Sequence, residues 1–147
     1  MNKLHITLLF TLLFSCFVMS AKNEIIGYGV NDFQDGVNFS VYNPITKDND
    51  GYWVWVEYEY TTPQTRKEDV LTQQIIYRKM ELMVYSLNWR KYAIASYTLY
   101  DKEGCVIRSY DYDVLDFRYI VPRSVGEDEM KYIKNIYNKY TTKQRKY

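Results

Sequence analysis

The chain has 147 residues, with 19 Lys and Arg against 18 Asp and Glu, one histidine and two cysteines. Tight nucleic-acid binding depends on an excess of basic side chains that meet phosphates, so this near-neutral balance argues against a nucleic-acid partner. The histidine is His5 and the cysteines are Cys16 and Cys105, too few for a structural zinc site of four Cys or His ligands.

The first 21 residues are typical of a signal peptide. Lys3 supplies a positively charged start, residues 4–19 are mostly apolar, and the small residues Ser20 and Ala21 precede the expected cleavage site. The apolar stretch is shorter than the ~20 residues of a membrane span, so we expect no transmembrane helix. We expect residues 1–21 to be removed, which predicts an exported protein that is periplasmic, secreted or held at the cell surface.

A second signal overlaps the first. Residues 13–16, Leu-Phe-Ser-Cys, resemble a lipobox, in which Cys16 would be acylated and would tether an outer-membrane lipoprotein. Phe14 is bulky where such signals carry a small or β-branched residue, and the apolar run continues past the cysteine. We therefore expect simple cleavage near Ala21 and keep lipidation of Cys16 as the alternative.

Removal of the signal peptide also limits the reactions that the remaining chain could catalyse. Residues 22–147 contain no histidine and one cysteine, Cys105, so Ser-His-Asp and Cys-His catalytic groups are excluded for lack of their general base. An intramolecular disulfide is excluded as well. Neither a P-loop nor a dinucleotide-binding or calcium-binding loop motif occurs. We expect no enzymatic activity, no metal and no cofactor.

Residues 22–140 predict a single α+β domain whose antiparallel meander of about six strands carries a C-terminal helix. The clearest strand alternates Tyr52, Val54 and Val56 on one face with Trp53 and Trp55 on the other. Asp-Gly between apolar runs indicates a hairpin turn, and similar turn residues end the later strands. The stretch 62–69 predicts a loop, and 70–74 is ambiguous between a short helix and the start of a strand. Strands are expected over 24–31, 37–42, 52–61, 75–87, 91–100, 105–112 and 117–121.

Toward the end of the chain, the apolar residues recur with the period of a helix. Ser124 and Glu127 have the spacing of a capping box, in which each side chain binds a backbone N–H at the start of a helix. An apolar stripe follows at three- and four-residue spacing and predicts packing on a sheet face. We expect 141–147 to be a frayed basic tail. The stripe comprises Val125, Tyr132, Ile133, Ile136, Tyr137 and Tyr140.

A longer order of strand, turn and cap residues runs from Met80 to Tyr132. It includes the strand and turn 92–104, the Tyr-Ile-Val-Pro run 119–122 and the Ser-Val-Gly-Glu run 124–127, with Trp-Val-Trp-Val-Glu-Tyr earlier at 53–58. This pattern resembles the surface-adhesin protein E-like family of bacteria. The resemblance implies an exported, envelope-associated, often dimeric protein with an antiparallel sheet and a C-terminal helix. Named members of that family bind host matrix or serum proteins.

Two positions depart from that family. Its members commonly carry a cysteine in the turn that holds Asn88 and Trp89 here, and another in the C-terminal helix, where this chain has Tyr132, Ile133 and Ile136. The disulfide between sheet and helix is therefore missing, and apolar packing must hold the helix in place.

Three tryptophans are candidate partner-binding residues. Trp53 and Trp55 share a strand face with two glutamates and could stack on sugar rings, or a helix or partner chain could cover them. Trp89 stands at a polar hairpin tip, where it is either a contact residue or a local anchor against Tyr92. The basic end of the chain could meet an acidic partner or membrane, or could be a solvated helix end. Its candidate residues are Lys139, Lys143, Arg145 and Lys146.

The sequence therefore favours a non-catalytic exported bacterial surface or envelope protein that binds a host matrix protein or a bacterial envelope protein. We expect a homodimer through a strand edge or the tryptophan face. One alternative is a structural or accessory periplasmic protein that docks to another bacterial protein, and a less favoured one is a carbohydrate-binding module. Carboxylate pairs such as Glu57 and Glu59 could in principle serve a glycosidase, but nothing in the sequence singles out a matched pair.

Overall fold

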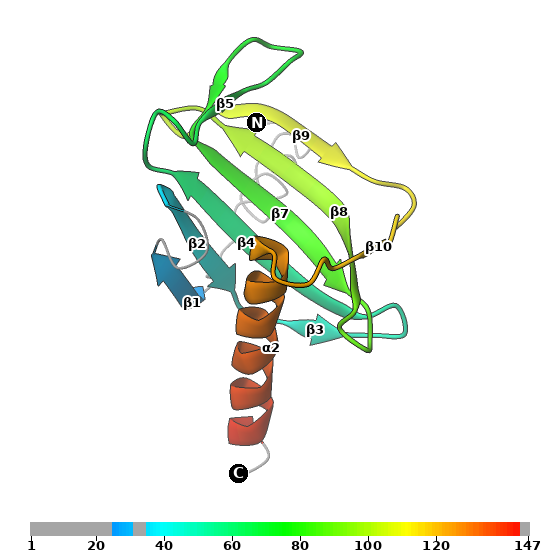
Figure 1. Ribbon diagram of the computed structural model, residues 1–147. Helices are drawn as coiled ribbons and strands as arrows, with labels where there is room; N and C mark the ends of the chain where they lie inside the picture. Colours follow the sequence, from blue (N-terminus) through cyan, green and yellow to red (C-terminus); the bar gives the residue numbers. More distant parts are fainter. Residues whose placement is uncertain (1–24, 31–34, 145–147) are drawn as a thin grey trace, which may run out of the picture.

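The computed structural model describes residues 25–30 and 35–144, which form an antiparallel sheet with one helix packed on it (Figure 1). The predicted α+β class and C-terminal helix are thereby confirmed. The expected signal peptide and Cys16 lie outside the described residues. In chain order the elements are β1 (Ile25–Val30), β2 (Val37–Tyr42), β3 (Thr46–Lys47), β4 (Tyr52–Tyr60), β5 (Lys67–Glu68), β6 (Ile75–Ile76), β7 (Arg78–Tyr85), β8 (Lys91–Tyr100), β9 (Val106–Asp111), β10 (Arg118–Tyr119) and α2 (Val125–Gln144).

The sheet is a meander in which the long strands lie beside their neighbours in sequence. Its order is β1-β2-β4-β7-β8-β10, β3 also pairs with β4, β9 also pairs with β8, and every pairing is antiparallel. β5 and β6 form a separate two-stranded hairpin within 67–76. The prediction of a loop over 62–69 is thus wrong at Lys67–Glu68. Two residues are too few to show the alternation of apolar and polar side chains by which a strand is predicted.

Strand β4 shows how the two faces of the sheet differ. Tyr52, Val54 and Val56 are buried, with 9%, 1% and 0% of their surface exposed, while Trp53 and Trp55 between them are half-buried. Because successive side chains of a strand point to opposite faces, the first three define the helix face, on which α2 packs. Trp53 and Trp55 belong to the outer face.

Helix α2 closes the helix face over one hydrophobic core. Ile133 and Ile136 are 0% and 7% exposed and join a cluster that includes Phe39 of β2 and Tyr85 of β7. Gly27 of β1 lies directly under the helix, where an added Cβ would overlap the Ile136 side chain. Because Gly27 has no side chain, α2 can lie close to the sheet at this point. Apolar packing, and not a disulfide, holds the helix there.

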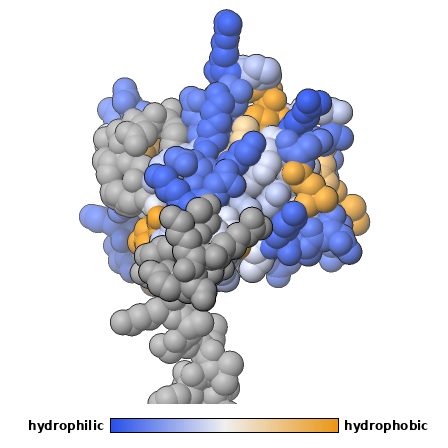
Figure 2. Space-filling model, turned by 90° about the horizontal axis from the view of Figure 1, so that it is seen from below, coloured by the Kyte–Doolittle hydropathy of each residue, from blue (hydrophilic) through white to orange (hydrophobic). Residues whose placement is uncertain are grey.

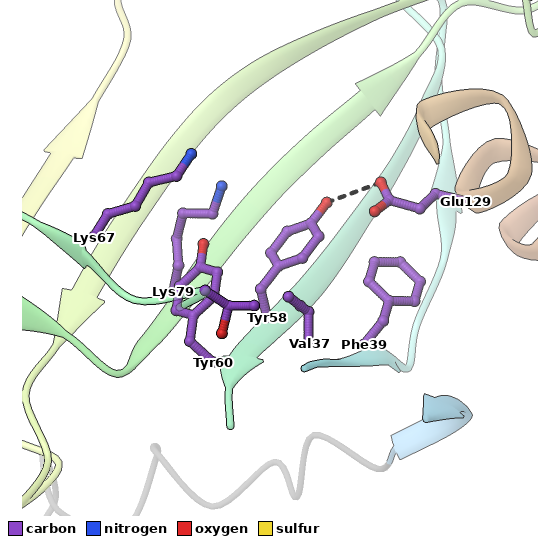
Figure 3. A pocket seen from close by; sticks show the side chains of 8 residues that line it. Val37, Phe39, Tyr58, Tyr60, Lys67, Lys79 and Glu129 are labelled. Carbon is purple, nitrogen blue, oxygen red and sulfur yellow. Dashed lines mark hydrogen bonds between the residues drawn. The ribbon is translucent and has the colours of Figure 1, made fainter. Parts of the chain in front are cut away.

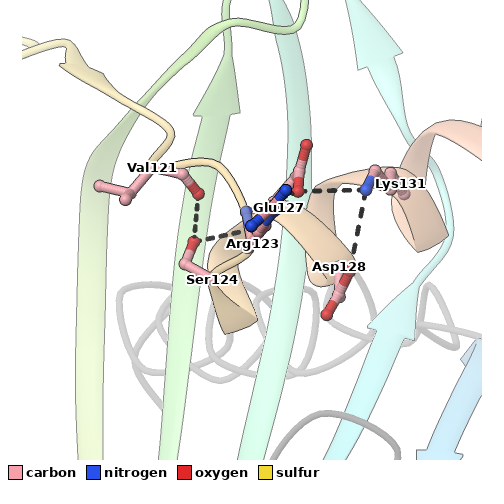
Figure 4. A network of polar contacts seen from close by, with 6 residues as sticks. All are labelled: Val121, Arg123, Ser124, Glu127, Asp128 and Lys131. Atoms are coloured by element: carbon pink, nitrogen blue, oxygen red, sulfur yellow. Dashed lines mark hydrogen bonds and ion pairs between the residues drawn. The ribbon is translucent and has the colours of Figure 1, made fainter.

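The predicted capping interactions form at the start of α2 (Figure 4). The Ser124 hydroxyl oxygen accepts the Glu127 N–H at 3.3 Å, while the Glu127 carboxylate accepts the N–H of Arg123 at 2.9 Å, one residue earlier than in a standard capping box. Lys131 lies 3.1 Å from the same carboxylate, one turn further on. These contacts satisfy N–H groups that a helix leaves without partners at its first turn.

The helix continues further than the sequence indicated. It ends at Gln144, so the expected frayed tail is wrong for 141–144. The Thr141 hydroxyl donates to the Tyr137 carbonyl oxygen at 2.9 Å, and neither Gly nor Pro interrupts the segment. The last turns of α2 extend past the sheet (Figure 1). Among the described residues, no helix combines the length and apolar character needed to cross a membrane.

Candidate functional site

Trp53 and Trp55 lie on the outer face of the sheet, opposite α2. Trp53 is paired in register with Val84 and Trp55 with Leu82, both on β7. The interpretation that the helix covers these tryptophans is therefore wrong, because the apolar stripe of α2 meets the Tyr52, Val54 and Val56 side of β4. The sugar-stacking and partner-chain alternatives for Trp53 and Trp55 stay predictions.

A line of polar contacts crosses the outer face from β2 to β8. The Tyr42 hydroxyl donates to the Glu57 carboxylate at 2.9 Å, Arg78 lies 3.6 Å from that carboxylate, and its guanidinium stands 4.1 Å from the Tyr100 ring centroid. Burial, followed by the Glu57 carboxylate, raises the pKa of Tyr42 to about 12. Glu57 is thus engaged with its neighbours on both strands, which argues against a free catalytic carboxylate at this position.

Trp89 lies in the core and not at an exposed hairpin tip. It is 8% exposed and has a φ of 60°, and its indole stacks on Tyr52 at 4.2 Å and on Tyr85 at 5.6 Å between ring centroids. The prediction of Trp89 as a partner contact is corrected for this reason, since its ring is enclosed. Its ring neighbours are Tyr52, Tyr85 and Tyr137, and Tyr92 packs against the same core cluster, which agrees with the alternative of a local anchor.

Of the four basic candidates, Lys139 and Lys143 belong to the last turns of α2. Lys139 is exposed on the helix, the side chain of Lys143 is not described, and Arg145 and Lys146 lie outside the described residues. Seen from below, the described surface is mainly hydrophilic and is interrupted by separate hydrophobic patches (Figure 2).

Three tyrosines that sequence reasoning did not single out gather at the β9 side of the sheet. Tyr110 and Tyr112 are 52% and 45% exposed, and their ring centroids lie 4.9 Å apart. Tyr97 of β8 is 6.1 Å from each, and the Arg108 guanidinium stands 5.6 Å from the Tyr97 ring centroid. We call Tyr97, Arg108, Tyr110 and Tyr112 the tyrosine surface. Alternation along 108–112 could have indicated its strand, but its neighbours on β8 depend on register.

The hairpin 67–76 adjoins this surface. Asp69 is 2% exposed, and its carboxylate lies 2.6 Å from the Arg108 guanidinium, an ion pair across 39 positions of sequence. The tip of the hairpin presents Val70 and Leu71, which are 88% and 74% exposed. Apolar side chains that are so exposed beside aromatic rings are typical of a surface that contacts another molecule.

A second group of polar residues lies beneath the first turns of α2 (Figure 3). The Tyr58 hydroxyl donates to the Glu129 carboxylate at 3.1 Å, and the Lys79 ammonium lies 2.9 Å from the buried Glu81 carboxylate. Burial raises the pKa of Glu129 to about 7; the Glu81 charge also raises it, while Tyr58 and Lys79 lower it. Glu129 is therefore partly protonated near neutral pH.

Two hollows of about 190 and 200 Å³ adjoin this group, and both are lined by Tyr58, Lys79 and Glu129. The first extends toward β2 and β5, and the second toward β8. Across the described ranges no three His, Cys, Asp or Glu residues gather as they would around a metal ion.

Comparisons with known proteins add nothing to this description of the site. Comparison with protein families, with curated proteins and with solved structures yields no match for the chain.

Proposed function

We propose that this chain is a non-catalytic exported bacterial binding protein, similar in role to the surface-adhesin protein E-like family. It binds a protein partner through the tyrosine surface and the adjoining hairpin tip. The observation that carries the proposal is the exposure of Tyr110, Tyr112, Val70 and Leu71 around the Asp69–Arg108 ion pair. Tyrosine offers a large, rigid contact area with a polar tip, and a central aromatic group with a charged rim is a common arrangement of protein-binding sites.

The test measures binding of the chain to immobilised host matrix and serum proteins at physiological salt, in parallel with pull-down from the source cell envelope. We expect saturable binding that the double substitution Tyr110→Ser and Tyr112→Ser abolishes. Tyr140→Ser is the matched control, because Tyr140 is similarly exposed, at 42%, but lies on α2. Binding of an envelope protein alone would favour the accessory role. A lack of binding in both assays would contradict the proposal.

The homodimer is proposed at the β9 edge. The Tyr112 N–H donates to the Ala95 carbonyl oxygen of β8 at 2.8 Å. Since successive N–H groups of a strand alternate in direction, those of Ser109 and Asp111 point away from β8 and can pair with a second copy. Ser109→Pro removes one outward donor while the β8 ladder stays intact, so it should shift the mass measured by light scattering from dimer to monomer. An unchanged dimer mass would place the interface elsewhere.

A further inference from the structure

The first of the two hollows combines an apolar floor with basic residues at its rim (Figure 3). Val37 and Phe39 of β2 form part of the floor and are 7% and 2% exposed. Lys67 of β5 and Lys79 of β7 line the same hollow and point to the same side of it (Figure 3). Strands β2, β4, β5 and β7 and the start of α2 therefore contribute to one concave surface.

The charges around the hollow do not cancel below neutral pH. Lys79 is paired with Glu81 at 2.9 Å, and Glu129 receives the Tyr58 hydroxyl and is largely protonated below pH 7. Lys67 is exposed, and no ion pair among the described residues includes it. One positive charge is thus left over beside an apolar floor, an arrangement that suits an anion with an apolar body.

We propose that this hollow binds a small organic carboxylate. The acid group would lie at Lys67 and Lys79, and the body would rest on Val37, Phe39 and the ring of Tyr58. The volume of about 190 Å³ is below the ~300–1,000 Å³ typical of sites for drug-sized molecules, so the ligand has a single ring or a short chain. This site reaches α2 at Glu129 and shares no residue with the tyrosine surface, although Lys67 belongs to the hairpin that adjoins that surface.

Glu129 couples this binding to pH. The groups that face it are Tyr58 and Tyr60 on β4 and Lys79, Glu81 and Tyr85 on β7. Above pH 7 its carboxylate ionises in the wall of the hollow and repels the carboxylate of the ligand. Affinity should therefore fall from pH 6 to pH 8 in the wild-type chain and stay level in Glu129→Gln.

The experiment is an NMR titration of the isotopically labelled full chain, as its expression host processes it, with three probes. Hexanoate carries both the acid group and the body, inorganic phosphate carries an acid group alone, and hexanol carries a body alone. We expect saturable shifts with hexanoate in the backbone amides of β4, β7 and the first turns of α2. Phosphate and hexanol should bind at least about tenfold more weakly, because each lacks one half of the recognition.

Substitutions locate the site. Lys67→Gln should weaken hexanoate binding about tenfold, and folding is not at risk because Lys67 is exposed. Lys102→Gln removes another exposed lysine, in the turn after β8, and should leave the affinity unchanged. The proposal is overturned if hexanoate causes no saturable shift, if hexanol binds equally well, or if Lys67→Gln binds as the wild type does.

Discussion

The two faces of the sheet differ in what holds them together. On the helix face, α2 and strands β2, β4 and β7 share an apolar core that includes Phe39, Val54 and Ile133. On the outer face, neighbouring strands are joined by polar and ring contacts such as those of Tyr42, Glu57 and Arg78. Buried apolar surface stabilises a fold far more than half-exposed ion pairs do. The helix face should therefore contribute most of the stability, and the partly exposed polar pairs of the outer face should tolerate change.

The sharpest test of this difference is removal of a core side chain from α2. Ile133→Ala should lower the free energy of unfolding by about 3 kcal/mol, because Ile133 is fully buried and its loss leaves a cavity. Denaturant unfolding measures the change. Val125→Ala on the same helix is the control and should cost under about 0.5 kcal/mol, since Val125 is 40% exposed. Equal losses in the two variants would mean that α2 is not held by the core.

Gly27→Ala tests how closely the helix must approach the sheet. The new methyl group would overlap the Ile136 side chain, so we expect a loss of about 2 kcal/mol in the free energy of unfolding. Ile136→Val should restore part of that loss in the double variant, which a double-mutant cycle detects. Gly126→Ala in α2 is the control and should be neutral or stabilising, because an added Cβ meets no close neighbour there. Strictly additive losses would contradict the overlap.

The pH dependence of stability provides a third test on the helix face. The pKa of Glu129 is raised from 4.5 to about 7, so the folded chain holds this proton more tightly than the unfolded chain does. The free energy of unfolding should fall by roughly 3 kcal/mol as pH rises from 4.5 through 7. Glu129→Gln should remove this slope in denaturant titrations at several pH values. Glu57→Gln on the outer face should leave the slope intact. If the slope persists in Glu129→Gln or disappears in Glu57→Gln, the pH dependence belongs to a group other than Glu129.

The smallest effects belong to the outer face. Glu57→Gln removes the ion pair with Arg78 and should cost under about 1 kcal/mol, because the pair is partly exposed. The pKa of Tyr42 should fall from about 12 but stay above 10, since burial is the largest cause of its shift. NMR of ring-labelled tyrosine follows this titration. Glu59→Gln on the same strand should leave the Tyr42 pKa unchanged. An equal fall in both variants would mean that the Tyr42–Glu57 hydrogen bond is not what raises the pKa.

Most of the sheet could be predicted because its signals are local. The alternation along 52–60, the Tyr, Ile and Thr content of 91–100 and the turn residues between strands depend on neighbours a few positions away. The core position of Trp89 could not be predicted in the same way. A tryptophan beside Asn88 in a turn reads as exposed, and only the stacking of Tyr52 from another strand shows that it is buried. Cys105, the first residue of the strand expected over 105–112, is exposed and lies just before β9.

The candidate sites were less predictable than the strands. The hairpin tip and the tyrosine surface are joined by Asp69 and Arg108, which are far apart in sequence. The hollow under α2 draws Phe39, Tyr58, Lys79 and Glu129 from four separate elements. Neither group follows a spacing rule, because each depends on strand register and on the position of the helix across the sheet.

The sequence by itself determined which long segments are strands, where the helix starts and how its apolar stripe is spaced, because backbone preference and side-chain period act over a few residues. Only the tertiary structure decided which face of β4 the helix covers, that Trp89 is enclosed, and that a carboxyl group on α2 joins Tyr58 and Lys79 in one partly buried cluster. These outcomes depend on contacts between residues far apart in the chain, and burial and charge take effect only once those residues are brought together.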